Sequence, residues 1–211
     1  MKRFFILGTD TDCGKTYVTC QLVHYFKKQQ ARVCAIKPVA SGCSYYGSQW
    51  LCADDFCLDE ANGEHIDLAK SWRLEQPISP HIAAEASGQK IEVDALIEAC
   101  ALNQFDTLDY LLIEGAGGLM VPLNQHETWV DFLVKSQIPV ILVVGMRLGC
   151  LNHALLTEHV LKAHGISCAG WIANALDESM QALAENISTL ERKIAVPLLG
   201  KVALGGAFIP Y

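Results

Sequence analysis

A glycine-framed segment near the start of the chain carries a lysine and a hydroxyl side chain in an order typical of phosphate binding. The segment Gly8–Thr16, with the letters GTDTDCGKT, follows the apolar run Phe4–Leu7 and precedes a stretch with helical spacing that extends to about Gln30. A strand that ends in such a loop leaves backbone N–H groups pointing inward at the start of a helix, whose dipole favours anions. Lys15 would then reach the β- and γ-phosphates, and the Thr16 hydroxyl would bind Mg²⁺.

The spacing of this loop differs from the strict phosphate-loop pattern. Five residues separate Gly8 from Gly14, where the strict pattern has four, and Thr9 follows the first glycine. The alternative is a tight turn between a strand and a helix that binds no ligand. We favour phosphate binding because the strand, the loop and the helix all occur where the motif requires them.

Charged residues follow two further apolar runs, at the points where the predicted strands end. Lys37 follows the run at 33–36, and Glu114 follows the run at 110–113 and precedes glycines at 115, 117 and 118. Ligands of open α/β sheets lie beyond the carboxyl ends of the strands. Glu114 is therefore placed to hold Mg²⁺, and Lys37 to stabilise charge on a transferred phosphoryl group. The alternatives are a surface glutamate that opens a turn and a solvated surface lysine.

Two adjacent carboxylates and an amide complete the set of polar candidates. Asp54 and Asp55 form a pair, of which one would be a second metal ligand and the other a residue at a helix start, where the dipole favours negative charge. The residue types do not choose between the two. Asn174 follows the apolar run at 166–172 and would lie at the same edge of the sheet.

Nine cysteines are scattered along the chain without a C-x-x-C pair. This distribution predicts reduced thiols that serve mostly as small buried apolar residues, and it does not favour zinc. Cys13 lies inside the phosphate loop at a helix start, where a thiol can be reactive. The alternative is a residue that only fills space in the loop.

Six apolar runs rich in β-branched residues alternate with segments of helical spacing. The runs are Phe4–Leu7, Val33–Ile36, Tyr110–Ile113, Val140–Val144, Ile166–Ile172 and Leu198–Val202. Near-continuous apolar strands that alternate with helices are typical of a parallel sheet covered on both faces. We therefore expect a doubly wound α/β fold, with a single domain over residues 1–211.

Turn residues mark several boundaries of these elements. Ser79 followed by Pro80 predicts the start of a helix that Gly88 ends. The stretch Cys43–Cys52 reads as a loop, and the tail Gly205–Tyr211 is expected to be irregular.

Charge and hydropathy bear on the partners and the location of the protein. The net charge is −7 and no run is rich in lysine or arginine, which argues against a nucleic-acid surface. The apolar run at the N-terminus is too short for a signal peptide, and no stretch reaches the length of a membrane span. We expect a soluble cytoplasmic protein.

Five segments, taken in order, resemble the dethiobiotin synthetase family, the ATP-dependent carboxylases of biotin synthesis. They are Gly8–Thr16, Lys37–Gly42, Glu114–Gly118, Leu148–Ala154 and Ala169–Asn174. The resemblance implies a P-loop NTPase-like fold and a reaction in which 7,8-diaminononanoate takes up CO₂ as a carbamate. ATP then phosphorylates the carbamate, and the second amine closes the ureido ring.

The resemblance also implies roles for individual residues. Lys15 and Lys37 would contact the γ-phosphate and the carbamate, with Thr11 and Ser41 nearby. Mg²⁺ would be held by Thr16, Asp54 and Glu114, a choice that selects Asp54 over Asp55. The ATP-binding residues would be Asp12, Cys13, Gly14, Lys15, Thr16, Tyr17, Asp54, Glu114, Gly115, Ala116, Gly117 and Asn174, with Asn174 on the adenine. In a homodimer, the partner subunit would hold the substrate carboxylate through Leu148, Gly149, Cys150, Leu151 and Asn152.

Another class of protein shares this sheet and a variant phosphate loop. Partition-type switch ATPases use hydrolysis to control a protein partner, and their loop carries an early lysine. Here Asp10 stands at that position, which favours the synthetase.

Overall fold

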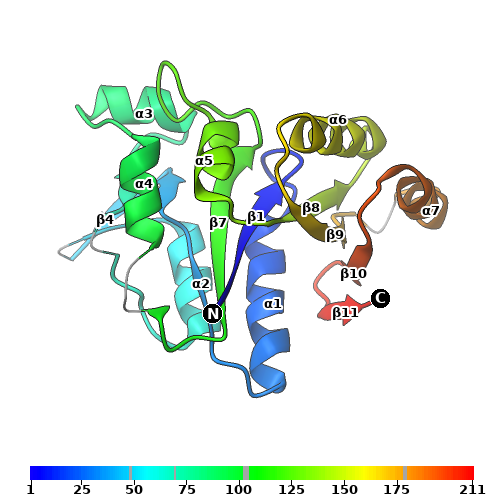
Figure 1. The fold of residues 1–211 in the computed structure, drawn as a ribbon. Helices are drawn as coiled ribbons and strands as arrows, with labels where there is room; N and C mark the ends of the chain where they lie inside the picture. Colours follow the sequence, from blue (N-terminus) through cyan, green and yellow to red (C-terminus); the bar gives the residue numbers. More distant parts are fainter. Residues whose placement is uncertain (48, 69, 102–104, 178–179) are drawn as a thin grey trace.

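A sheet of seven strands runs through the part of the chain that the structure describes (Figure 1). The structure is a computed structural model, and it describes residues 1–47, 49–68, 70–101, 105–177 and 180–211. In spatial order the strands are β11 (Phe208–Pro210), β10 (Leu198–Val202), β9 (Cys168–Ala175), β8 (Val140–Met146), β1 (Lys2–Gly8), β7 (Tyr110–Gly118) and β2 (Val33–Ile36). Neighbouring strands are parallel, except that β11 pairs with β10 in the antiparallel direction. Each of the six apolar runs of the sequence therefore corresponds to a strand of this sheet, although the run at 166–172 begins two residues before β9.

Two small pairs of strands and seven helices accompany the sheet within the described residues. β3 (Val39–Ser41) pairs with β6 (Trp72–Leu74) in parallel, and β4 (Ser44–Tyr46) pairs with β5 (Gln49–Leu51) as a hairpin. The helices are α1 (Lys15–Lys28), α2 (Ala53–Asn62), α3 (Pro80–Ala86), α4 (Val93–Cys100), α5 (Trp129–Ser136), α6 (Cys150–Ala163) and α7 (Leu183–Lys193).

Alternating side chains of β1 point to opposite faces of the sheet. Phe5 and Leu7 belong to one apolar cluster and Ile6 belongs to the other. Helices α1 and α2 contribute to the cluster of Ile6, whereas α3 to α7 contribute to the cluster of Phe5. Helices therefore cover both faces, which confirms the doubly wound α/β fold expected from the sequence.

Local signals set several helix starts. Ser79 precedes Pro80 at the first position of α3, as the sequence predicts. Helix α5 begins with a capping box, in which the Thr128 hydroxyl accepts from the backbone N–H of Val130 and the Asp131 carboxylate accepts from the backbone N–H of Thr128 at 2.7 Å.

Two sequence expectations about loops are wrong. The tail Gly205–Tyr211 is not irregular throughout, because β11 extends the sheet beside β10. The stretch Cys43–Cys52 contains the β4–β5 hairpin rather than a loop alone. The three strands β4, β5 and β11 have only three residues each, too few for a period-two pattern to stand out in the sequence.

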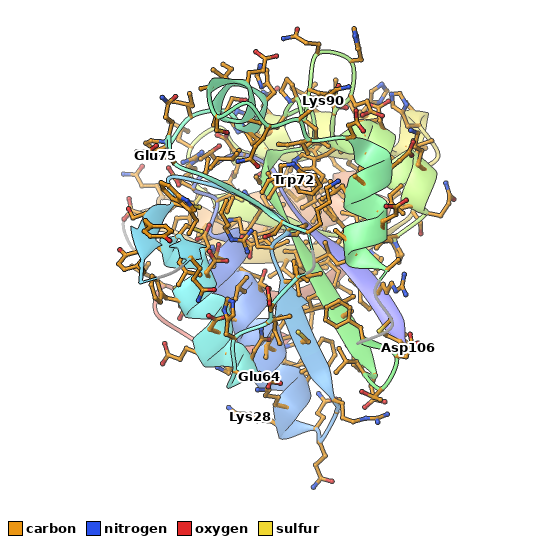
Figure 2. The ribbon with its side chains drawn as sticks, turned by 90° about the vertical axis from the view of Figure 1, so that its left-hand side faces the viewer. Lys28, Glu64, Trp72, Glu75, Lys90 and Asp106 are labelled. Carbon is orange, nitrogen blue, oxygen red and sulfur yellow. The ribbon has the colours of Figure 1, made fainter. Side chains whose placement is uncertain are left out.

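The two-stranded sheet of β3 and β6 packs beside the seven-stranded sheet. Trp72 of β6 is buried, and its indole N–H donates to the backbone oxygen of Lys90 at 3.0 Å. In Figure 2 Trp72 lies near the middle of the view, while Lys28 at the end of α1 lies near its lower edge. This packing joins the segment after β2 to the segment that leads into α4.

A side-chain amide covers the outer edge of β2. The backbone N–H of Ala35 donates to Asn62 Oδ1 at 2.9 Å, and Asn62 Nδ2 donates to the backbone oxygen of Ala35 at 2.8 Å. Asn62 is the last residue of α2. It therefore supplies the pair of hydrogen bonds that a further strand would make, and it fixes the end of α2 to the sheet.

Buried thiols make the stability of the fold sensitive to alkaline pH. Burial raises the pKa of Cys20, Cys34 and Cys100 from the ordinary 9.0 to about 12. Below pH 9.0 these thiols are protonated in both the folded and the unfolded state, so their contribution is fully present. As the pH rises toward 12, the unfolded chain gains stability by losing these protons, at about 1.4 kcal/mol per thiol and pH unit.

We therefore expect the urea midpoint of the reduced protein to fall as the pH is raised above 9.0. Cys100→Ala is the matched variant, because it removes the most buried of the three thiols. Its midpoint at neutral pH will be lower, since a cavity is created, but its decline with pH will be shallower. An equal decline in both proteins would contradict the assignment for Cys100.

Candidate active site

The phosphate loop lies at the carboxyl end of β1, between β7 and β8. Gly14 has φ +81° and directly precedes the first residue of α1, Lys15. A Cβ atom at Gly14 would collide with the side-chain amide of Asn174. Lys15 Nζ donates to the backbone oxygen of Asp10 at 3.0 Å, which folds the lysine back along its own loop. The strand, the loop and the helix thus follow one another in the order that the glycine-framed motif requires.

Four side chains from four separate elements meet next to this loop. Thr16 Oγ1 lies 2.6 Å from Glu114 Oε1 and 3.0 Å from Asp54 Oδ1. Lys37 Nζ donates to Glu114 Oε1 at 2.9 Å and also to Asp54 Oδ2. The threonine lies in the first turn of α1, the lysine follows β2, the aspartate lies in the first turn of α2 and the glutamate lies in β7. Lys37 and Glu114, which the sequence places at strand ends, therefore form one cluster with Thr16 of the phosphate loop and with Asp54.

In this cluster a buried lysine lies between two carboxylates. The Lys37 side chain is 8% exposed and that of Glu114 is 0% exposed. Burial alone lowers the pKa of Lys37, but the charges of Glu114 and Asp54 outweigh burial and raise this pKa above its ordinary value. Burial likewise raises the pKa of Asp54, and Lys37 outweighs it, so that this pKa is lowered. The lysine therefore stays cationic and the aspartate stays anionic at neutral pH.

The cluster has the donor set that Mg²⁺ requires. Glu114 Oε2 is buried and has no hydrogen-bond partner among the described residues. A buried carboxylate oxygen without a partner is costly unless a cation or a water molecule contacts it. Together with Thr16 and Asp54, Glu114 offers the hard oxygen ligands that Mg²⁺ prefers. The residues present therefore fit the metal that the sequence predicts.

The structure distinguishes the two adjacent aspartates. Asp55 is 4% exposed and forms two hydrogen bonds with Arg73, from Nε at 2.9 Å and from Nη2 at 2.7 Å. It also accepts from the backbone N–H of Cys52, which caps α2. Asp54 instead faces Thr16 and Lys37. Asp55 is therefore the residue that caps the start of α2. Asp54 is the aspartate that joins the cluster.

A cavity of about 780 Å³ opens beside the cluster. Its lining includes ten of the site residues expected from the sequence: Thr11, Asp12, Gly14, Lys15, Thr16, Lys37, Ser41, Asp54, Ala116 and Gly117. Five further lining residues were missed, namely Pro77, Ile78, Ser79, Pro80 and Val121. The sequence of residues 77–80 indicated only the start of a helix. Nothing in it predicted that this segment lines a cavity together with the phosphate loop.

Some predicted nucleotide residues lie beneath or beside the loop rather than on the cavity wall. Asn174 is 2% exposed, and its Nδ2 donates to the backbone oxygen of Cys13 at 2.9 Å. Cys13 itself is 1% exposed. The Tyr17 hydroxyl donates to the backbone oxygen of Gly206 at 2.8 Å. Asn174 therefore supports the loop, and the adenine contact expected of it stays a prediction.

The predicted substrate-carboxylate segment is separate from this cavity. Leu148 is fully exposed and Gly149 precedes α6 with φ +95°. Cys150 is buried in the core, Leu151 packs partly against it, and Asn152 is exposed. Within one chain the segment is absent from the described lining of the cavity.

An ion pair that was not expected from the sequence joins Arg147, the residue before this segment, to the phosphate loop. Arg147 Nη2 lies 2.6 Å from Asp10 Oδ2, while Asp10 Oδ1 accepts from the backbone N–H of Thr11 at 2.8 Å. The two charged residues are far apart in the sequence, so no local pattern could have paired them. Asp10, which stands where switch ATPases carry a lysine, thus has a partner on the loop after β8.

The sheet, the phosphate loop and the carboxylate cluster define a P-loop nucleotide-binding protein. In agreement, a family described as AAA domain matches residues 2–204. More narrowly, the chain belongs to the ATP-dependent dethiobiotin synthetase family. It is 51% identical over 206 residues to the ATP-dependent dethiobiotin synthetase BioD of Legionella pneumophila strain Lens, which covers 98% of this chain and 95% of the relative. The protein of the same name from Nitrosospira multiformis is 43% identical over 204 residues, covering 94% and 87%.

Solved structures confirm the fold. Cell division protein FtsY from Thermotoga maritima superposes with a TM-score of 0.64 at 15% identity, covering 100% of this chain and 65% of that one. Chloroplast FtsY from Physcomitrella patens gives 0.59 at 18% identity, covering 100% and 61%. This chain thus spans less than two thirds of those proteins, and the likeness concerns the fold alone. Among the described residues, no helix is both long and apolar enough to cross a membrane.

Proposed function

We propose that this chain closes the ureido ring of dethiobiotin from 7,8-diaminononanoate and CO₂, using ATP and releasing ADP and phosphate. One amine of the substrate takes up CO₂ as a carbamate, and ATP phosphorylates the carbamate. The second amine then attacks the mixed anhydride and expels phosphate. The observation that carries the proposal is the meeting of Lys37, Thr16, Asp54 and Glu114 at the phosphate loop, in a chain whose relatives are named for this synthesis.

The proposed roles follow from charge and position. A phosphoryl transfer of this kind needs positioning and charge neutralisation more than a protein nucleophile. Lys15 begins α1 and would bind the β- and γ-phosphates, with the N–H groups of the loop. Lys37 would neutralise charge that develops between the γ-phosphate and the carbamate. Thr11 and Ser41, both on the cavity wall, would orient these groups.

Thr16, Asp54 and Glu114 are proposed to hold Mg²⁺. When bound, this ion would offset the negative charge of the phosphates. The chain's own part is to present three oxygen ligands from three elements at fixed positions. Support comes from the partnerless Oε2 of Glu114 and from the commitment of Asp55 to Arg73, which leaves Asp54 as the aspartate of the site.

A homodimer is proposed because one chain leaves the segment Leu148–Asn152 away from its own cavity. The backbone N–H groups at the start of α6 and the Asn152 amide would hold the substrate carboxylate from the partner subunit. We further infer that residues 1–211 act as one domain. Use of ATP and small soluble substrates supports a cytoplasmic location.

The test is phosphate release from ATP and Mg²⁺, with and without 7,8-diaminononanoate and bicarbonate. Release that requires both compounds, together with formation of dethiobiotin, is the expected result. Release that is indifferent to both would overturn the proposal and would favour the switch ATPase, whose hydrolysis serves a protein partner.

Asn152→Ala tests the cross-subunit site. Loss of a hydrogen bond to a charged carboxylate is expected to raise the KM for the diamine about tenfold, with little change in the KM for ATP. Steady-state kinetics with each substrate varied in turn measure the two values. His159→Ala, farther along the same helix, serves as the control. Equal increases in both KM values would count against the role of Asn152.

A further inference from the structure

Two buried cysteines face each other at the base of the β4–β5 hairpin. In the hairpin Ser44 pairs with Leu51 and Tyr45 pairs with Trp50. Continuing this antiparallel register outward by one residue sets Cys43 opposite Cys52. Directly opposed residues of antiparallel strands have Cα atoms about 4.5 to 5.5 Å apart, which lies within the range that a disulfide spans. The register itself therefore brings the two thiols into bonding range.

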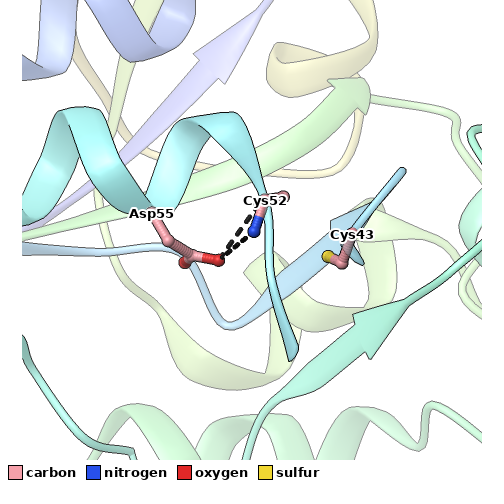
Figure 3. Close-up of side chains that lie close together, drawn as sticks. All are labelled: Cys43, Cys52 and Asp55. Carbon is pink, nitrogen blue, oxygen red and sulfur yellow. Dashed lines mark hydrogen bonds between the residues drawn. The ribbon is translucent and has the colours of Figure 1, made fainter. Parts of the chain in front are cut away.

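The side chains agree with the register. The sulfur atoms of Cys43 and Cys52 and a carboxylate oxygen of Asp55 all lie within 4.8 Å of one another. Figure 3 shows Cys43 on the segment facing Cys52, with Asp55 on the far side of Cys52. Cys43 is 2% exposed and Cys52 is 5% exposed, and both are free thiols. The two thiols are therefore neighbours, and a disulfide requires the sulfur atoms to approach to about 2.05 Å.

A metal centre is a poorer fit to the same three residues. Both carboxylate oxygens of Asp55 bind the Arg73 guanidinium, and one also accepts from the Cys52 backbone and thiol. The guanidinium places a positive charge next to the position that a cation would take. No fourth His, Cys, Asp or Glu joins this group among the described residues, whereas structural zinc sites have four protein ligands.

We propose that Cys43 and Cys52 form a reversible intramolecular disulfide, which makes this hairpin base an oxidation site of the protein. A small-molecule disulfide such as oxidised glutathione is the oxidant. Its S–S bond breaks, the Cys43–Cys52 bond forms, and the two thiol protons of the cysteines pass to the two released glutathione thiolates. The two cysteines are oxidised and the glutathione disulfide is reduced, so atoms and electrons balance. A cytoplasmic disulfide of this kind is transient.

Access to the pair follows from the exposed hairpin. Tyr45, Tyr46 and Trp50 are 59%, 51% and 38% exposed, so little of the hairpin is packed against the rest of the chain. Opening a short exposed hairpin is a low-cost local motion. It would uncover both thiols at once and leave the main sheet intact.

The Cys43–Cys52 disulfide would lie close in sequence to residues of the proposed active site. Ser41 lies two residues before Cys43, and Asp54 lies two residues after Cys52. Both of these polar residues line the cavity. The disulfide would fix the end of β3 to the start of α2, and so would restrain the parts of the cavity lining to which these residues belong. The oxidation site itself does not depend on the identity of the reaction.

The experiment titrates the intact protein with mixtures of reduced and oxidised glutathione. After blocking the free thiols, intact mass and peptide mapping identify the bridge. The expected result is an intact mass with two blocking groups fewer than the fully reduced protein carries, a linked peptide pair containing Cys43 and Cys52, and full reversal by excess reductant. Cys43→Ser and Cys52→Ser must each abolish this product. Cys57→Ser, which changes an exposed thiol on α2, must leave it unchanged.

Three results would overturn the proposal. The first is an absence of the linked pair at every ratio while other cysteines carry mixed disulfides. The second is a bridge that persists in either serine variant. The third is one equivalent of tightly bound zinc in the reduced wild type that both serine variants lose, which would assign the pair to a metal instead.

Discussion

Lys37→Gln is expected to lower kcat by about a hundredfold to a thousandfold, the usual effect of removing one preorganised group that stabilises charge in a transition state. Lys37 is the cation that lies between Asp54 and Glu114 at the edge of the cavity. Glutamine keeps a hydrogen-bond donor but not the charge. The loss should therefore appear in kcat more than in the KM for ATP.

The same substitution should change stability in a way that Mg²⁺ reverses. Without ligand, Glu114 would be a buried carboxylate deprived of its cation, at a cost of about 3 kcal/mol. We expect a lower Tm in the absence of Mg²⁺, and a larger rise of Tm with Mg²⁺ than in the wild type, because the cation replaces the missing charge.

Thermal unfolding with and without Mg²⁺, together with ring-closure kinetics, measures both effects. Lys37→Arg, which keeps the charge, and Lys90→Gln, which removes a surface lysine paired with Glu92, are the controls. Near-normal kcat in Lys37→Gln would remove Lys37 from the chemistry.

Glu114→Gln should raise the Mg²⁺ concentration needed for half-maximal activity by about tenfold or more. The substitution has nearly the same shape, so it keeps the fill of a fully buried position. It removes one of two negative charges and replaces an oxygen ligand by an N–H donor. The amide would also face Thr16 and Lys37, both of which donate to Glu114 Oε1.

Activity measured over a range of Mg²⁺, and calorimetric ATP binding with and without Mg²⁺, give the required values. ATP binding without Mg²⁺ should be preserved, because a negative charge beside the phosphates has been removed. Glu92→Gln, a change at an exposed carboxylate, is the matched control. An unchanged Mg²⁺ requirement would show that Glu114 is not a ligand.

The sequence predicted the parts of the site that lie at strand ends. Lys37 and Glu114 each follow a run of apolar residues, and parallel strands bring their carboxyl ends to one edge. That rule alone was enough to place them near Thr16. The rule could not choose between Asp54 and Asp55, because the choice depends on Arg73, which binds Asp55. Arg73 is too far from Asp55 along the chain for a local sequence pattern to indicate this ion pair.

The parts that the sequence did not predict depend on long-range contacts. Pro77 to Pro80 follow β6 and line the same cavity as the phosphate loop, from which they are distant in the sequence. The short strands β4, β5 and β11 are set by pairing with a neighbour, and three residues carry too little pattern to indicate it. The Asp10–Arg147 pair likewise joins two loops that only the fold brings together.

The amide of Asn62 on the outer edge of β2 also bears on self-association. An uncovered edge strand can pair with an edge strand of another molecule and so start aggregation. Here one edge has its hydrogen bonds at Ala35 satisfied internally. The opposite edge is β11, a strand of only three residues that ends in Pro210, which has no N–H to donate. Strand addition is thus disfavoured on both sides, and copies of this chain would meet through helices and loops instead.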